Sequence, residues 1–434
     1  LTLPDGSTLT CSEVLRLLPN KRLVVRATHH QQTVLAKLFF DDGNWKKEIS
    51  GYAQLRKTDI KTPELLAQYA MDDGGICLYA FIANAQPLDA LWQQADETSK
   101  QQYLQQLLPC LQTLWQHRLL QRDLHLGNFL LQISPDDQTE TLWVLDPASC
   151  EPFTQPNAQQ ENIALLIAQL SLPDWSWVLK QLSTDTSLTD LVKQQWQQRL
   201  QQYLKKIFRD CTEIADISPN KQLRILCHRA ALTDALASAL CKPEQLLQQA
   251  VTLKNGNSAK VFLIEVDKKK LVVKQYINKD GLRKLRRAFR PSRAARSWYF
   301  SHAFAFAGIA VPAPIALIER KKSFFVTNAW FISEYCADDD LLTHWQQHTP
   351  SREELLNMQA LFQSLQQLHF SHGDMKATNL LSDGKRITVI DYDGAQEHRN
   401  TTSLQNALRK DKQRLLQNWH NNTQLQQQLT ECLL

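Results

Sequence analysis

Two stretches of the chain place carboxylate and amide side chains at a spacing suited to phosphoryl transfer. In each, an aspartate is followed five residues later by an asparagine, and a later hydrophobic strand ends in a second aspartate: Asp123, Asn128 and Asp146, then Asp374, Asn379 and Asp391. The first aspartate would orient an attacking hydroxyl and accept its proton. The amide and the second carboxylate supply the oxygen ligands that Mg²⁺ prefers. We therefore predict two candidate sites that use ATP and Mg²⁺.

A lysine on a strand is expected to complete each site by neutralising the α and β phosphates. Alternating apolar and polar residues predict three strands at the start of each half: Glu13–Leu18, Arg22–Thr28 and Thr33–Phe39, then Val251–Leu253, Lys260–Val266 and Leu271–Tyr276. Lys37 and Lys274 lie on the third strand of their halves. Glu48, on the helix expected next, would hold Lys37 in place, whereas Ser297 stands at the matching position of the second half.

The hairpins that would cover the phosphates differ between the halves. The second half has the turn Asn255-Gly256-Asn257-Ser258, in which Gly256 lets the backbone approach a phosphate, whereas the first hairpin, Leu18–Arg22, has no glycine. Lys376, two residues after Asp374, is expected beside the reacting centre as a further catalytic residue. The sequence leaves open which half is catalytic, and one half can be an inactive pseudokinase that scaffolds the other.

The order of these features repeats along the chain, which indicates a duplicated domain. Both halves carry an Ile-x-x-Pro mark, at 60–63 and 309–312, and a long helix expected before the motif, at 99–119 and 352–369. A chain of 434 residues also exceeds what one hydrophobic core usually serves. The predicted fold class is α+β, with two tandem protein-kinase-like bilobal folds, each a small β-rich N-lobe and a mostly helical C-lobe. We expect a first domain over 1–225, a linker over 226–249 and a second domain over 250–434.

The motif segments 121–130 and 372–381 resemble the catalytic loops of the lipopolysaccharide kinase family of the Kdo/WaaP and InaA type. Segments 291–298, 308–314 and 409–419 add to this resemblance, which covers nearly the whole chain. It implies an ATP-dependent kinase that phosphorylates a heptose or Kdo hydroxyl of the lipopolysaccharide core glycolipid. By motif position it also implies these roles: Asp123 and Asp374 as catalytic residues, Asn128, Asp146, Asn379 and Asp391 as metal ligands, Lys37 and Lys274 as phosphate contacts.

The positive charge of the chain is concentrated in one segment, the basic arm at 279–296. It holds eight basic residues and one acid, so the rest of the chain is slightly acidic although the whole carries +5. Leu282, Leu285 and Phe289 follow helical spacing there, which favours an amphipathic helix on an anionic membrane surface or a phosphorylated glycan. A solvated basic helix is the alternative; nucleic acid is not expected, because strands with interleaved aromatic residues are missing.

The chain has no stretch that resembles a membrane span, and its nine cysteines are dispersed without a CxxC pair. These features predict a protein of a reducing compartment without a disulfide framework or zinc site. Together with the resemblance, they predict a cytoplasmic location, peripheral to the inner membrane. Two other functions stay open: a tandem pseudokinase scaffold for core-assembly enzymes, and a small-molecule phosphotransferase of the aminoglycoside type, which shares the His-Gly-Asp-x4-Asn pattern.

Overall fold

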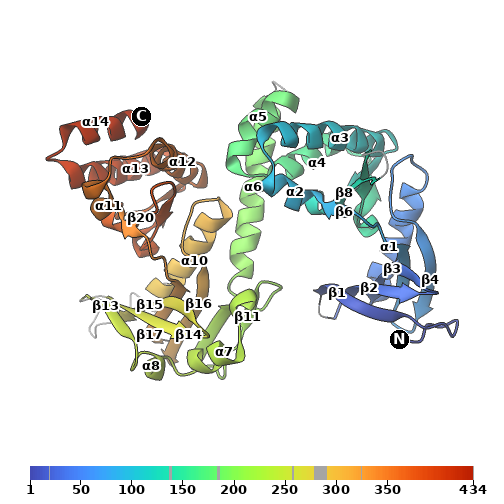
Figure 1. Ribbon diagram of the computed structural model, residues 1–434, viewed down its shortest axis with the longest axis horizontal. Helices are drawn as coiled ribbons and strands as arrows, with labels where there is room; N and C mark the ends of the chain where they lie inside the picture. The colour runs from blue at the N-terminus through green and yellow to red at the C-terminus, as the bar shows by residue number, and fades with distance from the viewer. Residues whose placement is uncertain are drawn as a thin grey trace. The chain divides into compact units, whose positions relative to one another are not determined.

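The computed structural model describes residues 1–18, 20–135, 139–182, 186–256, 259–277, 291–323 and 325–433. The chain mixes helix and sheet and divides into two compact units, Leu1–Trp196 and Gln197–Leu434. Each unit starts with an antiparallel sheet and continues into a mostly helical part (Figure 1). None of the described helices has the length and apolar character that crossing a bilayer requires.

The first unit opens with a five-stranded antiparallel sheet in the order β1-β2-β3-β5-β4. Its strands are β1 (Thr10–Leu18), β2 (Arg22–His29), β3 (Gln32–Phe39), β4 (Leu65–Met71) and β5 (Gly74–Ala80). Because side chains alternate along a strand, Val34 and Ala36 of β3 enter the core on one face, whereas Phe39 packs on the other face against α1 (Asp42–Leu55). The same alternation turns Lys37 toward α1.

The rest of the first unit is mostly helical. Its helices are α2 (Leu88–Gln94), α3 (Glu97–Gln116), α4 (Ala158–Ile167), α5 (Leu172–Leu182) and α6 (Thr186–Lys206), which continues past the end of the unit. Two small antiparallel sheets hold the motif segment: β6 (Ala85–Pro87) with β8 (Phe129–Ile133) and β9 (Glu140–Val144), and β7 (Leu119–Gln121) with β10 (Cys150–Pro152). The motif residues therefore lie in the turns that connect short strands.

The second unit opens with a seven-stranded antiparallel sheet in the order β11-β12-β16-β17-β15-β14-β13. Its strands are β11 (Ile214–Asp216), β12 (Leu223–His228), β13 (Val251–Asn255), β14 (Ala259–Val266), β15 (Lys269–Ile277), β16 (Pro314–Lys322) and β17 (Phe325–Glu334). The three strands expected at the start of each half are thus present. The segment expected as a linker, 226–249, contains the end of β12 and the helices α7 (Asp234–Leu240) and α8 (Pro243–Leu246).

Helices cover both faces of this sheet. Leu236 and Leu240 of α7 join one hydrophobic core with Trp330 and Ile332 of β17. Figure 1 shows α7 and α8 on that side and α10 (Arg293–Phe306) on the other. Since α10 follows β15 and packs beside it, this helix brings its first turns close to the end of the strand that carries Lys274.

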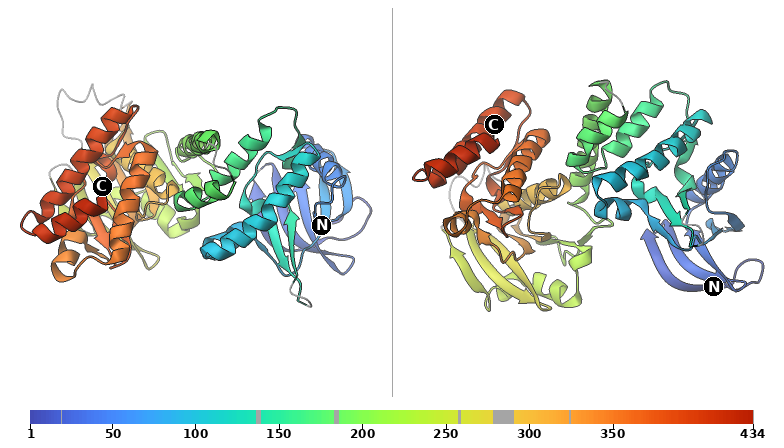
Figure 2. Two further views of the ribbon diagram at one scale, coloured as in Figure 1. Left: turned by 90° about the horizontal axis from the view of Figure 1, so that it is seen from above. Right: turned by 45° about the horizontal axis from the view of Figure 1, so that its top comes forward.

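The C-terminal part of the second unit is helical around short strands. Its helices are α11 (Leu341–Gln347), α12 (Arg352–Leu368), α13 (Thr401–Leu416) and α14 (Thr423–Leu433). A capping box of Ser351 and Glu354 starts α12, the helix expected before the motif. The two views of Figure 2 show the last helices, in orange and red, packed side by side. Between α12 and α13 lie β19 (Phe370–Ser371), β20 (Leu380–Ser382), β21 (Ile387–Val389) and β22 (Gln396–Glu397), which frame the motif residues.

Candidate active site

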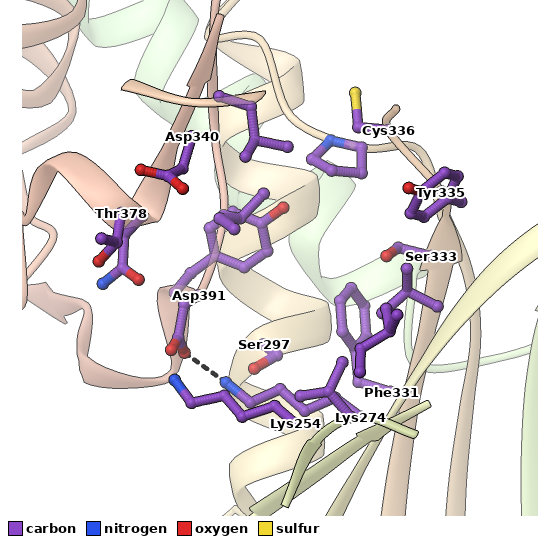
Figure 3. A pocket seen from close by; sticks show the side chains of 18 of the residues that line it. Lys254, Lys274, Ser297, Phe331, Ser333, Tyr335, Cys336, Asp340, Thr378 and Asp391 are labelled. Atoms are coloured by element: carbon purple, nitrogen blue, oxygen red, sulfur yellow. Dashed lines mark hydrogen bonds and ion pairs between the residues drawn. The ribbon is translucent and has the colours of Figure 1, made fainter. Parts of the chain in front are cut away.

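A cavity of about 600 Å³ opens in the second unit between its sheet and the motif segment. Lys254, Gly256 and Lys274 line it from β13, the following turn and β15, and Asn379 and Asp391 line it from the motif side. Figure 3 shows Lys254 and Lys274 pointing toward Asp391. The cavity therefore joins four residues that the sequence assigned to nucleotide or metal, together with Lys254, which was not foreseen. Asn257 and Ser258 lie outside the described residues.

Lys274 is held by two carboxylates of one short segment. Its ammonium group pairs with Asp391 and lies 3.8 Å from Oδ2 of Asp393. Burial alone would raise the pKa of Asp391, but the Lys274 charge outweighs it and the pKa lies below its usual value. The pKa of Asp393 is raised, because burial and the neighbouring Asp391 charge outweigh the cations beside it. Asp391 is therefore the more acidic carboxylate of this pair.

Helix α10 reaches the same cluster through Arg293. Nε of Arg293 donates to Oδ2 of Asp393 at 2.9 Å, so Asp393 lies between the arginine and Lys274. Ser297, one turn further along α10, is buried and hydrogen-bonds the hydroxyl of Tyr276 at 2.7 Å instead of contacting the lysine. In the second unit, α10 is thus linked to Lys274 through Arg293 and Asp393. In the first unit, Glu48 of α1 contacts its lysine directly.

The segment that carries Asp374 is anchored on a buried carboxylate. Asp411 of α13 accepts hydrogen bonds from the backbone N–H groups of His372, at 2.8 Å, and Gly373, at 3.0 Å. Gly373 has φ +78°, and a Cβ there would lie 2.4 Å from the carbonyl oxygen of Gly394. This position therefore needs glycine so that the segments of Asp374 and Asp391 can approach each other.

Asn379 and Asp391, on the motif side of the cavity, carry side-chain oxygens that fit a divalent cation. Nδ2 of Asn379 donates to the backbone oxygen of Asp374 at 2.8 Å, which leaves its Oδ1 as the outward oxygen of the amide. Asp391 has the left-handed φ of 64°, uncommon for a residue with a side chain, and its carboxylate meets the cavity. A carboxylate and an amide oxygen on one cavity wall are the hard ligands that Mg²⁺ binds, usually with several waters and phosphate oxygens.

In the second unit, Asp374 and Lys376 lie beside the cavity and not in its lining. Nζ of Lys376 is 3.1 Å from Oδ1 of Asp374, and Nη1 of Arg414 is also 3.1 Å from that oxygen. Nδ2 of Asn379 approaches the other carboxylate oxygen at 3.4 Å. Asp374 is thus oriented by an amide and two cations next to the expected position of the phosphates.

The first unit forms the lysine–glutamate pair that the second lacks. Nζ of Lys37 lies 2.5 Å from Oε1 of Glu48, whose side chain is fully buried, and the hydroxyl of Tyr79 donates to the same oxygen at 2.9 Å. Burial, followed by the Glu48 charge, raises the pKa of Tyr79. Gly51 of the same helix permits close packing, since a Cβ there would lie 1.8 Å from the carbonyl oxygen of Pro147. Helix α1 is therefore tightly fixed against the segment that follows Asp146.

The carboxylate expected to bind metal in the first unit is paired with an arginine. Nη1 of Arg22 donates to Oδ1 of Asp146 at 3.2 Å, with both side chains largely buried. Asp146 has a left-handed φ of 55°, as Asp391 does in the second unit. Asn128 donates to the backbone oxygen of Asp123 at 2.7 Å, so the local geometry of the motif repeats. The two units differ in the cation that pairs with the strand-end aspartate, which is Arg22 in the first unit and Lys274 in the second.

Sequence reasoning missed several residues that complete these sites: Arg22, Arg293, Asp393, Asp411 and Arg414. One signal was visible, since Asp391-Tyr392-Asp393 places two carboxylates on one short turn. Most of the basic arm, residues 279–290, lies outside the described residues. At its end, Arg293 contacts Asp393 and Arg296 donates to the backbone oxygen of Ala395 at 2.7 Å.

Comparison with known families matches residues 244–432 to the lipopolysaccharide kinase (Kdo/WaaP) family. The matched range lies, apart from its first residues in α8, over the sheet strands from β13 onward and the helical part of the second unit. Among solved structures the chain is similar to one described as WaaP in complex with acyl carrier protein, with 18% identity and a TM-score of 0.34, over 44% of this chain and 79% of that chain. No curated protein matches the chain.

Proposed function

Because residues 244–432 match the lipopolysaccharide kinase (Kdo/WaaP) family, we propose that the second unit transfers the γ-phosphate of ATP to a heptose or Kdo hydroxyl of the lipopolysaccharide core. The observation that carries this proposal is the convergence of Lys274, Asn379 and Asp391 on one cavity, with Asp374 at its edge. The family implies a phosphotransferase that uses ATP and acts on a glycolipid. The choice of sugar and the residue roles are our proposal.

In the proposed reaction, Asp374 accepts the proton of the acceptor hydroxyl as its oxygen bonds to the γ-phosphorus. The bond from that phosphorus to the β–γ bridging oxygen breaks, and ADP leaves. Lys274 contacts the α and β phosphates, for which it exchanges its ion pair with Asp391. Asp391 and Oδ1 of Asn379 would hold Mg²⁺, which neutralises charge between the phosphates. Gly256 would let the turn after β13 close over them.

We also propose that each unit is a kinase-like fold with a sheet-rich N-lobe and a helical C-lobe. This is supported by the repeated order of a sheet with its lysine strand, a helix packed on it, a long helix, the Asp-x4-Asn turn and the strand-end aspartate. The domain limits 1–225 and 250–434 remain predictions; α7 and α8 pack on the sheet of the second unit, as a part of its N-lobe.

Catalysis is assigned to the second unit because of the pairing of Arg22 with Asp146. The guanidinium group of Arg22 is a permanent cation and pairs with Asp146. It therefore takes the place on this carboxylate that a metal ion bound to phosphates would need. In the second unit the matching carboxylate pairs with Lys274, a residue that contacts nucleotide in the proposed reaction. We therefore propose that the first unit is a pseudokinase.

A transfer assay with matched variants tests this assignment. Wild-type protein is incubated with radiolabelled ATP, Mg²⁺ and core glycolipids that differ in their phosphorylation. We expect Asp374→Asn to abolish labelled product, because loss of a general base costs about 10²–10⁴-fold. Asp123→Asn, the same change in the first unit, is expected to leave the rate unchanged. Loss of product with Asp123→Asn alone would assign catalysis to the first unit, and no product from any acceptor would favour a tandem pseudokinase scaffold.

Association with the cytoplasmic face of the inner membrane is proposed from the basic arm and from the glycolipid substrate implied by the family. Each basic residue near an anionic surface contributes about 1 kcal/mol. Replacement of Arg286, Arg287 and Arg290 by glutamine should therefore reduce co-sedimentation with vesicles that contain an anionic lipid. Equal sedimentation of wild type and variant would contradict this part of the proposal.

A further inference from the structure

The carboxylate of Asp374 is flanked by two partly exposed cations. Lys376 and Arg414 both lie 3.1 Å from its Oδ1, and their side chains are 50% and 45% exposed. Exposed ion pairs contribute about 0–1 kcal/mol to stability, so the fold gains little from them. Stability therefore does not explain why two cations lie beside the proposed general base.

Arg414 has hydrogen-bonding capacity that the chain does not use. It extends from α13, and its Nη1 donates to Oδ1 of Asp374 and, at 2.6 Å, to the backbone oxygen of Gly373. Its Nε and Nη2 atoms have no hydrogen-bond partner among the described residues. Guanidinium groups bind carboxylates and phosphates through pairs of parallel hydrogen bonds. One edge of this guanidinium is thus available to an anion.

The position of these cations separates them from the nucleotide. The cavity proposed for ATP is lined by Lys254, Lys274 and Arg293, whereas Lys376 and Arg414 do not line it. They lie around the carboxylate that would receive the proton of the acceptor, so they face the approach of the acceptor.

The first unit provides an internal contrast. Asp123 there is 71% exposed, and the one basic side chain that lies near it among the described ion pairs is the imidazole of His125, at 3.8 Å. The adjacent Arg122 pairs with Glu151 instead. The motif therefore keeps its geometry in the first unit without an arginine on Asp123, whereas Arg414 pairs with Asp374 in the second unit.

We propose, on the premise of the function proposed above, that Arg414 is a specificity-determining residue that binds an anionic group of the acceptor. With Lys376 beside it, it would bind a sugar carboxylate or a phosphate monoester next to the reacting hydroxyl. The anion would share the guanidinium with Asp374, since Nη1 of Arg414 pairs with that carboxylate and the other edge of the guanidinium can bind the acceptor. A neutral sugar lacks this ion pair.

The inference is tested by combining variants of Arg414 with acceptors that lack one kind of anionic group. The probe is a deacylated inner-core oligosaccharide in three forms: unmodified, with its carboxyl groups reduced, and with its phosphates removed. Arg414→Gln is expected to raise the KM for the unmodified probe about 10- to 100-fold, the effect of losing a hydrogen-bonded charge pair. It should leave the KM for ATP unchanged. Arg409→Gln, on an exposed position of the same helix, is the control, and Arg414→Lys should recover part of the loss.

If the KM for the carboxyl-reduced probe no longer changes with Arg414→Gln, the anion bound by Arg414 is a carboxylate. If the KM for the dephosphorylated probe no longer changes, the anion is a phosphate. If Arg414→Gln reduces transfer to all three forms by the same factor, the arginine only supports the Asp374 segment and the inference is wrong. It is also wrong if wild-type protein prefers none of the three forms.

Binding of the three probes, measured by calorimetry with a non-hydrolysable ATP analogue, separates this inference from the proposed function. Charge-dependent binding through Arg414 without any transfer would refute the kinase activity and support the anion site. Transfer that does not depend on Arg414 or on the charge of the probe would support the kinase activity and refute the anion site.

Discussion

Replacement of Asp393 by asparagine tests how the second unit positions its lysine. Asp393 is 12% exposed and lies between Nε of Arg293, at 2.9 Å, and Nζ of Lys274, at 3.8 Å. The amide keeps the shape of the side chain but removes the charge that holds both cations. A hydrogen bond to a charged group contributes about 1.5–3 kcal/mol, and each 1.4 kcal/mol corresponds to a factor of ten. We therefore expect kcat/KM for ATP to fall about 10- to 150-fold.

The opposite result is physically possible, which makes this experiment decisive. Asp393 carries negative charge near the proposed phosphate site, so its removal would strengthen ATP binding if simple electrostatic repulsion dominated. An unchanged or increased kcat/KM for Asp393→Asn would refute the positioning argument. Asp339→Asn is the matched control, because Asp339 lines the same cavity and has no ion pair with Lys274 among those described.

A second substitution can restore the lost contact. Ser297 stands where Glu48 stands in the first unit, and Glu48 reaches its lysine at 2.5 Å. Ser297 also lines the cavity, which provides space for a longer side chain. We expect Ser297→Glu to recover part of the activity of Asp393→Asn, as measured by kcat/KM for ATP. Further loss in the double variant would show that α10 does not approach Lys274 as the first unit's α1 approaches Lys37.

Two further predictions concern stability. Glu48→Gln leaves Lys37 buried without its countercharge, so the free energy of unfolding of the first unit should fall by about 3–5 kcal/mol in urea titrations followed by tryptophan fluorescence; a loss below about 1 kcal/mol would contradict the buried pair. His302 has its pKa lowered to about 3 by burial, so it is neutral when folded and binds a proton near pH 6.5 when unfolded. The contribution of His302 to the free energy of unfolding is complete above about pH 6.5. It is lost at up to about 1.4 kcal/mol per pH unit as the pH falls toward 3. His302→Gln should flatten this dependence, whereas equal slopes would exclude His302 as its source.

The parts of the site that the sequence indicated are those encoded within short segments. The turn from Asp374 to Asn379 has a fixed spacing, and Asn379 returns a hydrogen bond to the backbone of Asp374 in the structure. The strand patterns placed Lys37 and Lys274 on the last of the three strands predicted for each half, and β3 and β15 carry them, because alternation along a strand is a local property. Local chemistry of this kind does not depend on how distant segments meet.

The parts that were missed depend on distant segments. Arg22 and Asp146 are separated by 124 residues, and neither residue type nor spacing identifies such a pair. In the sequence, Ser297 stands at the position that matches Glu48, and no other partner for Lys274 was identified there. The residue that provides the link, Arg293, lies one turn earlier on the same helix and has the opposite charge to a glutamate. A motif that gives one residue type for each position cannot show that an arginine and an aspartate replace a glutamate as the link to the lysine.

The linker predicted over 226–249 remains a prediction, but the segment has regular structure of its own. The segment has no motif residue and was expected to link two domains, yet Leu236 and Leu240 are almost fully buried against the sheet. The apolar positions repeat at helical spacing, which indicates an amphipathic helix in its own right. Strand β12 precedes it and pairs with β16, whose sequence lies far along the chain. Long-range strand pairing of this kind is invisible in a local pattern.

The contrast between the two units gives a physical reason for a division of labour. In both, a left-handed aspartate presents a carboxylate that needs a cation. In the first unit the cation is Arg22, which is fixed beside Phe39 in the sheet and stays charged at any physiological pH. In the second unit it is Lys274, whose charge is shared with Asp393, so that Asp391 would be available to hold a metal ion and Lys274 to contact phosphates. Under the proposed function, nucleotide binding would displace a buried arginine in the first unit and would only redistribute existing charges in the second, which favours the second unit as the site of transfer.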